Sequence, residues 1–238
     1  MRRLDFIPGT ICDQRLWSRL TPLLGDEVQC HFVPLHQARD RAQMQRLIAD
    51  HSAPSANLVG FSLGAYLAIE YALLHPERVS SLVLIANSAR GLSANEIQTR
   101  RRIVPMLRNN TYTGMSRARL REVLHPSHLD DQSIVDTIQQ MALDLGKEVL
   151  LAQFAASIER PDLMERLAEI TCPVLIVGAD ADKLVAPADL HEMHQHLPQS
   201  RLSMHADTGH MLPLEVPQAL AQVLNDFFST INATKVEF

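Results

Sequence analysis

The chain has 238 residues, a formal net charge of −5, 46% hydrophobic residues and 21% charged residues. These values predict one large globular domain, or one domain that carries an insertion. The acidic balance argues against a nucleic acid as partner, because domains that bind phosphate backbones are usually basic.

Several features argue against a membrane or secreted protein. No apolar run approaches the roughly 18 residues that a membrane helix needs. The first residues, "MRRLDFIPGT", contain no apolar segment of the signal-peptide type. The three cysteines, Cys12, Cys30 and Cys172, form an odd set without C-x-x-C spacing, which suits a reducing compartment. We therefore expect a cytoplasmic location.

Strand-like and helix-like segments alternate along the chain. Strands are predicted over residues 4–9, 29–35, 56–61, 80–87, 172–179 and 200–206. Helices are predicted over residues 12–24, 39–51, 64–76, 187–197 and 214–228. This alternation predicts an α/β fold, with a mostly parallel sheet and helices on both faces. Runs such as "LVLIA" and "VLIVG" are apolar throughout, as buried parallel strands are.

Residues 89–171 break this alternation. They contain no convincing strand, but apolar residues recur at helical spacing in three groups. These groups are Ile134, Ile138, Met141 and Leu145; Leu151, Phe154 and Ile158; and Leu163, Leu167 and Ile170. We expect a core formed by residues 1–88 and 172–238, with residues 89–171 as a helical cap inserted before the strand at 172–179.

The segment "LVGFSLGAYLA" contains a G-x-S-x-G motif centred on Ser62. Ser62 follows a predicted strand and precedes a predicted helix, which is the context in which this motif holds a nucleophile on a sharp turn. Gly60 and Gly64 would relieve crowding at such a turn. A strand-to-helix turn with incidental glycines is the alternative, so the motif depends on finding a base and an acid.

Candidate partners lie in two later loops. His210, in "ADTGHMLPLEVP", follows the last predicted strand and is the candidate base. Asp180 and Asp182, in "VGADADKLVAP", follow a buried strand, and either carboxylate could orient the imidazole. "HEMHQH" at 191–196 differs from the H-E-x-x-H zinc motif because residue 195 is Gln, so we expect a solvated helix face and no metal there.

These features together resemble the α/β-hydrolase family over nearly the whole chain. The matching segments are the turn "IPGTICDQRLW", the elbow "GFSLG", the helical cap, the acid loop "VGADADKLVAP" and the histidine loop "TGHMLPLEVP". The nearest resemblance is to small bacterial carboxylesterase-like hydrolases, a group that includes the pimeloyl-acyl-carrier-protein methyl ester esterases.

The resemblance implies roles for individual residues. Ser62 would be the nucleophile, His210 the base and Asp182 the acid, since counting back from the "DKLVAP" segment favours Asp182, whereas counting forward from Gly178 leaves Asp180 open. The backbone N–H groups of Leu63 and Thr10 would form the oxyanion hole, although this chain has Pro-Gly-Thr where the family commonly has His-Gly. No metal or organic cofactor is implied.

The resulting prediction is a serine hydrolase that acts on an ester or thioester of a small or medium acyl group through an acyl-enzyme. Within the same fold, the triad could instead serve carbon–carbon bond hydrolysis, lyase chemistry or perhydrolysis. A non-catalytic ligand-binding protein of this fold is the alternative from another class. A serine at residue 62, where epoxide hydrolases and haloalkane dehalogenases use aspartate, argues against those two activities.

Residues 90–125 are strongly basic. They contain only two acidic residues, Glu96 and Glu122, against eight arginines: Arg90, Arg100, Arg101, Arg102, Arg108, Arg117, Arg119 and Arg121. Such a surface could dock an acidic acyl-carrier protein or an anionic substrate. A solvated helix face accounts for the same pattern without any partner.

Overall fold

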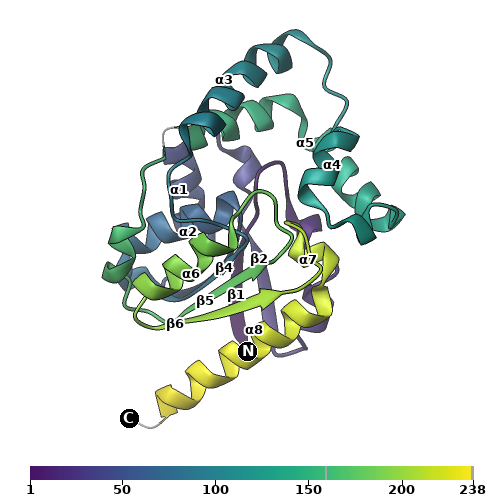
Figure 1. The fold of residues 1–238 in the computed structure, drawn as a ribbon. Helices are drawn as coiled ribbons and strands as arrows, with labels where there is room; N and C mark the ends of the chain where they lie inside the picture. The colour runs from purple at the N-terminus through teal and green to yellow at the C-terminus, as the bar shows by residue number, and fades with distance from the viewer. Residues whose placement is uncertain (159, 237–238) are drawn as a thin grey trace.

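The structure is a computed structural model that describes residues 1–158 and 160–236, with side chains described as far as Ile231. Its strands are β1 (Arg2–Ile7), β2 (Val28–Phe32), β3 (Ala56–Phe61), β4 (Val79–Ile85), β5 (Val174–Ala179) and β6 (Ser200–His205). They form one sheet in the order β2-β1-β3-β4-β5-β6 (Figure 1). Every neighbouring pair is parallel, which confirms the predicted sheet.

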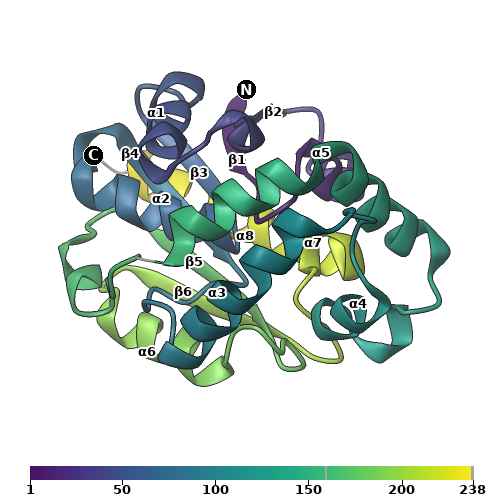
Figure 2. The ribbon, with the colours of Figure 1, turned by 90° about the horizontal axis from the view of Figure 1, so that it is seen from above.

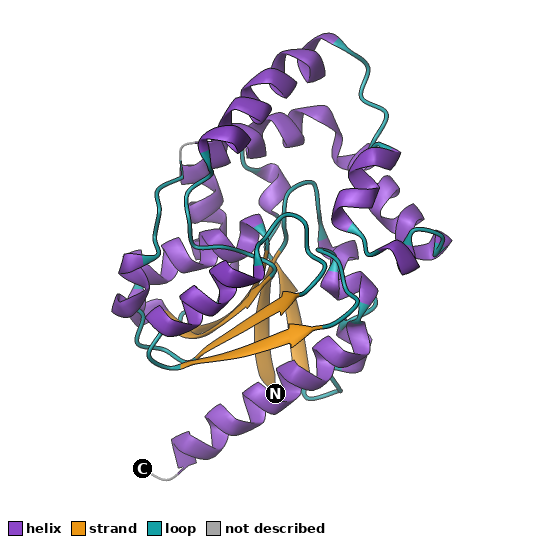
Figure 3. Ribbon diagram, viewed as in Figure 1, coloured by secondary structure: helices purple, strands orange, loops and turns teal. Residues whose placement is uncertain are grey.

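Helices cover both faces of this sheet (Figure 3). The α-helices outside the cap are α1 (Arg41–His51), α2 (Leu63–Leu74), α6 (Pro187–His196), α7 (Leu212–Glu215) and α8 (Pro217–Val236). Successive residues of a strand point to opposite faces. Leu58 and Leu84 accordingly pack with α1, α2 and α6 on one face. Val59 and Ile85 pack with α8 on the other.

A helical cap lies between β4 and β5. It contains α3 (Ala94–Asn109), α4 (Arg117–Val123) and α5 (Gln132–Ile158). Seen from above, α3 and α5 cross over the sheet at the side where the strands end (Figure 2). Helix α5 is broken at Gly146, whose φ of 75° is accessible to glycine at little cost. The cap therefore covers the carboxyl ends of the strands, where the strand-to-helix turns lie.

One predicted helix is wrong. The segment 12–24 forms two short 3-10 helices, η1 (Gln14–Trp17) and η2 (Thr21–Leu23), instead of one α-helix. Pro22 lacks the N–H that a continuous helix would require at that position. The apolar residues that suggested a helix are nevertheless buried, and Leu16, Trp17 and Leu20 are fully enclosed in the core.

Two other predicted helices differ in extent. The helix predicted over 214–228 is divided into α7 and α8 at Pro217, which suits a first helical position because it has no N–H to satisfy. Helix α8 also continues to Val236, through a tail with no predicted structure. The stripe at 163–170 forms a 3-10 helix, η6 (Glu165–Glu169), and its apolar residues pack into the core beside α2 and α6.

Candidate active site

Ser62 lies in the turn between β3 and α2, in a strained conformation. Its φ is 52° and its ψ is −116°, far outside the regions that non-glycine residues ordinarily occupy. Its amide N donates to the carbonyl of Ile85, at the end of β4, over 2.8 Å. Such strain persists only where the surroundings enforce it, and it clusters at functional sites.

The two glycines of the motif allow the turn to form. A Cβ on Gly60 would lie 2.5 Å from the Cα of Ala65, and a Cβ on Gly64 would lie 2.3 Å from the carbonyl oxygen of Ile7. Neither contact is sterically possible, so both positions need a residue without a side chain. The turn therefore packs directly against the first residues of α2 and the end of β1.

The structure brings Ser62, His210 and Asp182 into one hydrogen-bonded line. The Ser62 Oγ lies 3.0 Å from the His210 Nε2, and the His210 Nδ1 lies 2.8 Å from the Asp182 Oδ2. Both the histidine and aspartate side chains are buried. Because a carboxylate only accepts, the Nδ1 carries the proton and the Nε2 is free to accept from the serine hydroxyl.

The structure also distinguishes the two candidate acids. Asp182 is held by its other oxygen, Oδ1, which accepts from the backbone N–H groups of Leu184 and Val185 over 2.8 and 3.2 Å. Asp180 is exposed, and its backbone N–H donates to the carbonyl of His205. Asp182 is therefore the aspartate that lies against His210.

A buried glutamate fixes the loop that carries His210. The Glu215 side chain is fully buried, and it accepts from the backbone N–H groups of Gly209 and Met211, on either side of the histidine. It also accepts from the N–H of His125 in the cap and lies 3.0 Å from the His128 Nδ1. Glu215 is not among the residues predicted from the sequence, although an acidic side chain within "MLPLEVP" is an available signal.

The turn after β1 lies against Ser62. A Cβ on Gly9 would come within 3.2 Å of the Ser62 Cβ, so the backbone that leads to Thr10 passes directly beside the serine. Ile11, next in the chain, has a φ of 53°, and its N–H donates to the Gln153 Oε1 over 2.7 Å. Gln153 is a fully buried residue of α5 that the sequence analysis also missed. It holds the turn from the cap side, where the family histidine is absent.

The other candidate site is the histidine-rich segment at 191–196. In "HEMHQH", the His194 Nδ1 bonds to the hydroxyl of Ser200 over 2.7 Å. Over the described part of the chain, no group of three or more His, Cys, Asp or Glu side chains is arranged to hold a metal ion.

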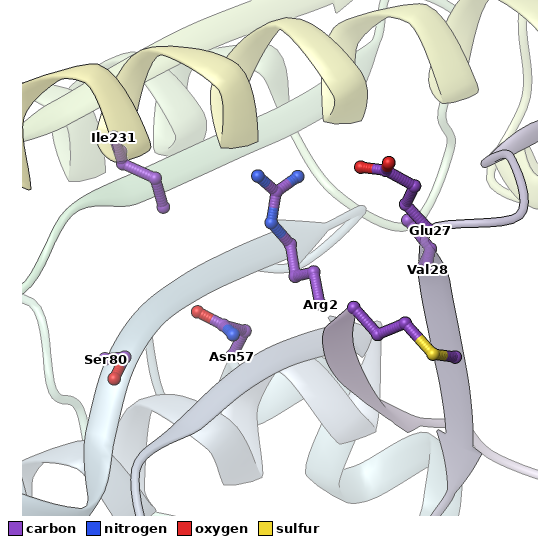
Figure 4. Close-up of a pocket in the computed structure, with 7 residues that line it drawn as sticks. Arg2, Glu27, Val28, Asn57, Ser80 and Ile231 are labelled. Atoms are coloured by element: carbon purple, nitrogen blue, oxygen red, sulfur yellow. The ribbon is translucent and has the colours of Figure 1, made fainter.

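A polar hollow of about 350 Å³ lies near the amino ends of β1 to β4, at the end of the sheet opposite Ser62 (Figure 4). Two of its polar lining groups already have partners: Arg2 donates to the carbonyl of Phe228, and Asn57 donates to the carbonyl of Arg3. In parallel α/β sheets, ligands bind beyond the carboxyl ends of the strands, where Ser62 and His210 lie.

The comparison with known families agrees with this geometry. A model described as alpha/beta hydrolase fold matches residues 34–217. The chain belongs to the α/β-hydrolase fold family. The match contains the elbow, the cap, the acid loop and the histidine loop, and the fold and hydrolase class that the sequence predicted are confirmed.

Individual relatives of this α/β hydrolase carry several names. The pimeloyl-[acyl-carrier protein] methyl ester esterase of Photobacterium profundum is 27% identical, over 94% of this chain and 93% of its own length. A 2-hydroxy-6-oxononadienedioate/2-hydroxy-6-oxononatrienedioate hydrolase of Paraburkholderia phymatum is 29% identical, over 72% of this chain and 62% of its own length. An esterase from Thermogutta terrifontis superposes with a TM-score of 0.83 at 22% identity, over 97% of this chain and 90% of its own, which shows a shared fold.

Proposed function

We propose that this α/β hydrolase is a serine esterase or thioesterase that acts on a small or medium acyl group. The observation that carries the proposal is the line from the Ser62 Oγ through the His210 imidazole to the Asp182 carboxylate. Methyl ester esterases among the relatives support an ester as the scissile group.

The proposed reaction has two halves. His210 takes the proton from Ser62 as the hydroxyl attacks the acyl carbonyl, and Asp182 stabilises the resulting imidazolium. The oxyanion is bound by the N–H groups of Leu63 and Thr10, each contributing on the order of 3 kcal/mol to the transition state. His210 then protonates the leaving group, and a water activated by the same histidine releases the acyl group from Ser62.

Two features support these donors. Leu63 is the first residue of α2, and the first N–H groups of a helix have no partner within it. Thr10 follows Gly9, which packs against Ser62. Both amides therefore belong to segments that border the serine.

The test is turnover of p-nitrophenyl esters with acyl chains of about two to twelve carbons, by wild type and by Ser62→Ala. We expect hydrolysis with a chain-length optimum, and a loss of about 10⁴-fold or more in the variant. Equal rates in both proteins, or no turnover of any ester, would reject the esterase assignment. Inactivity with every ester, together with unimpaired ligand binding by Ser62→Ala, would favour the non-catalytic alternative.

A second candidate is hydrolysis of a carbon–carbon bond by the same triad. It is supported by the 29% identical relative, which is named as a hydrolase of 2-hydroxy-6-oxononadienedioate. A diketone acid of that type would be consumed by wild type faster than any p-nitrophenyl ester if this candidate is right.

We further propose that the exposed arginines of α3 and α4 receive an acidic acyl-carrier protein that presents the acyl group. These are Arg101, Arg102, Arg108, Arg117, Arg119 and Arg121. Relatives named as esterases of a carrier-bound pimeloyl ester support this partner. We expect binding of an acyl-carrier protein that weakens steeply as salt rises. An affinity independent of salt and of Arg101→Glu would contradict this docking surface.

None of the described helices has the length and hydropathy required to cross a membrane.

A further inference from the structure

Two arginines of the cap, Arg100 and Arg160, lie near enough to repel each other, and neither forms an ion pair with an acidic side chain among the described residues. Arg100 is on α3, Arg160 follows α5, and both are partly buried. The Arg100 Nη1 and the Arg160 Nε are inaccessible to solvent, and neither has a hydrogen-bond partner among the described residues. A buried cation without a counter-charge is costly, so the two arginines are a candidate for binding an anion.

Aromatic rings support both guanidinium groups. The Arg160 guanidinium lies 4.6 Å from the ring centroid of Tyr66, and the Arg100 guanidinium lies 5.0 Å from that of Phe154. The Tyr66 hydroxyl donates to the carbonyl of Pro161 over 2.8 Å, which fixes the chain next to Arg160. Ring faces stabilise a cation while leaving its in-plane N–H groups available to a ligand.

The two arginines carry like charges and repel each other. Burial, together with the nearby Arg160, lowers the pKa of Arg100 to about 10, so Arg100 still carries its charge at neutral pH. Burial likewise lowers the pKa of Arg160. An anion between the two groups would relieve this repulsion.

The nearest carboxylates are committed to other groups. The Glu96 Oε2 accepts from both the backbone N and the hydroxyl of Ser93, in the capping box of α3. Asp162 accepts from the N–H of Met164 and lies 3.6 Å from the Arg90 Nη1. Neither of them forms an ion pair with Arg100 or Arg160 in the part of the chain that the structure describes.

The other arginines of the basic segment provide a contrast. Arg90 is held by Asp189 and Glu192 in addition to Asp162, and Arg119 pairs with Glu122 over 2.7 Å. Arg101 and Arg102 are exposed on α3 and need no partner, because water solvates them. Arg100 and Arg160 thus differ from these arginines because they are partly buried and form no ion pair among the described residues.

The pair lies close to the candidate nucleophile. The Tyr66 N–H donates to the carbonyl of Ser62 over 3.1 Å, so the ring beneath Arg160 is one helical turn from the serine. Phe154, beneath Arg100, follows Gln153, which holds the turn beside Ser62. One turn of helix and one tyrosine side chain span on the order of 10 Å, a distance that an acyl chain of several carbons covers.

We infer that Arg100 and Arg160 form a subsite for an oxyanion, a carboxylate or phosphate, at the end of the substrate remote from Ser62. The inference rests on the proposed esterase function and specifies its substrate class as anionic esters. Planar guanidinium groups bind such oxyanions with paired N–H donors, and this binding discriminates against a neutral chain of equal length.

The test compares two p-nitrophenyl esters of the same chain length: the hexanoate and the monoester of adipic acid, which adds a terminal carboxylate. We expect wild type to favour the adipate monoester by about 10-fold or more in kcat/KM, mainly through a lower KM. Arg100→Gln and Arg160→Gln should each remove most of this preference and leave hexanoate turnover unchanged. Arg46→Gln, an exposed arginine of α1 outside the cap, is the control and should change neither substrate.

The outcomes separate this inference from the proposed function. Efficient hydrolysis of both esters without a preference for the anion would overturn the subsite and leave the esterase standing. A loss on both substrates together with a lower melting temperature would show a structural role for the arginines and would also overturn it. Removal of a repelling pair should instead leave the melting temperature unchanged or higher.

Direct titration with adipate and with inorganic phosphate tests the subsite even if no ester is cleaved. Binding of either anion that Arg160→Gln abolishes and Arg46→Gln leaves intact would support the inference. The tighter of the two anions identifies whether a carboxylate or a phosphate is the natural group. Absence of binding by both anions at millimolar concentration would overturn it.

Discussion

The buried charged groups around Ser62 and two buried arginines of the cap differ in how they are paired. At the sheet edge, Asp182, His210 and Glu215 are buried, and each has hydrogen-bond partners within the protein. In the cap, Arg100 and Arg160 retain buried N–H groups that have no partner among the described residues. A satisfied network fixes geometry, which catalysis requires before the substrate arrives. A cation without a counter-charge is able to bind an anion, and such a group lets a site favour one class of substrate over another.

The largest effect on this comparison is expected from Asp182→Asn. An amide at this position can donate to His210 and stabilise the wrong tautomer, so kcat for a p-nitrophenyl ester should fall by about 10⁴-fold. Asp180→Asn, two residues earlier and exposed, is the matched control and should retain full activity. Equal losses in the two variants would remove Asp182 from the proposed triad.

The second effect concerns the support of the histidine loop. In Glu215→Gln, one acceptor oxygen becomes an NH₂ group that faces backbone N–H donors, leaving buried donors unpaired at a cost of about 1–3 kcal/mol. We expect a lower melting temperature and a kcat that falls more than KM changes, since the residue positions His210 without touching substrate.

The control for this variant is Glu169→Gln, which alters an exposed glutamate paired with Arg166. It should leave both the melting temperature and kcat unchanged. If Glu215→Gln lowers stability while kcat keeps its wild-type value, the loop does not depend on this carboxylate for its catalytic geometry.

The sequence and the structure agree where the determinants are local. The Ser62 turn follows from a strand, two glycines and a helix that are adjacent in the chain. The acid loop follows the apolar strand β5 and the histidine loop follows the neighbouring strand β6, so a parallel sheet brings both loops to the same end. The helix predicted at 12–24 failed because burial of Leu16, Trp17 and Leu20 does not require a continuous helix.

The remaining features depend on contacts between distant residues. The bond from Ile11 to Gln153 joins positions separated by 142 residues, and that from His125 to Glu215 joins positions separated by 90. No periodicity encodes such pairings. The sequence likewise shows that residues 90–125 are rich in arginine, but burial decides that Arg100 differs from its neighbours Arg101 and Arg102.

The smallest effect concerns the cysteine beside the oxyanion turn. Burial and, to a smaller extent, Asp13 raise the pKa of the Cys12 thiol to about 12, so below that pH the unreactive neutral thiol predominates. Iodoacetamide at about pH 8 should therefore leave esterase activity intact and leave Cys12 unmodified in a peptide map. Rapid inactivation with alkylation of Cys12 would show that this thiol is accessible and that the turn opens.

The measurement that tests the central claim most directly is the mapping of a covalent adduct on the native protein. An alkyl fluorophosphonate should add one phosphonyl group per chain, located by mass spectrometry on the peptide that contains Ser62, with complete loss of ester hydrolysis. The Ser62→Ala protein should remain unmodified under the same conditions. A fully active protein without an adduct, or an adduct on another residue that abolishes activity, would contradict the assignment of Ser62 as the nucleophile.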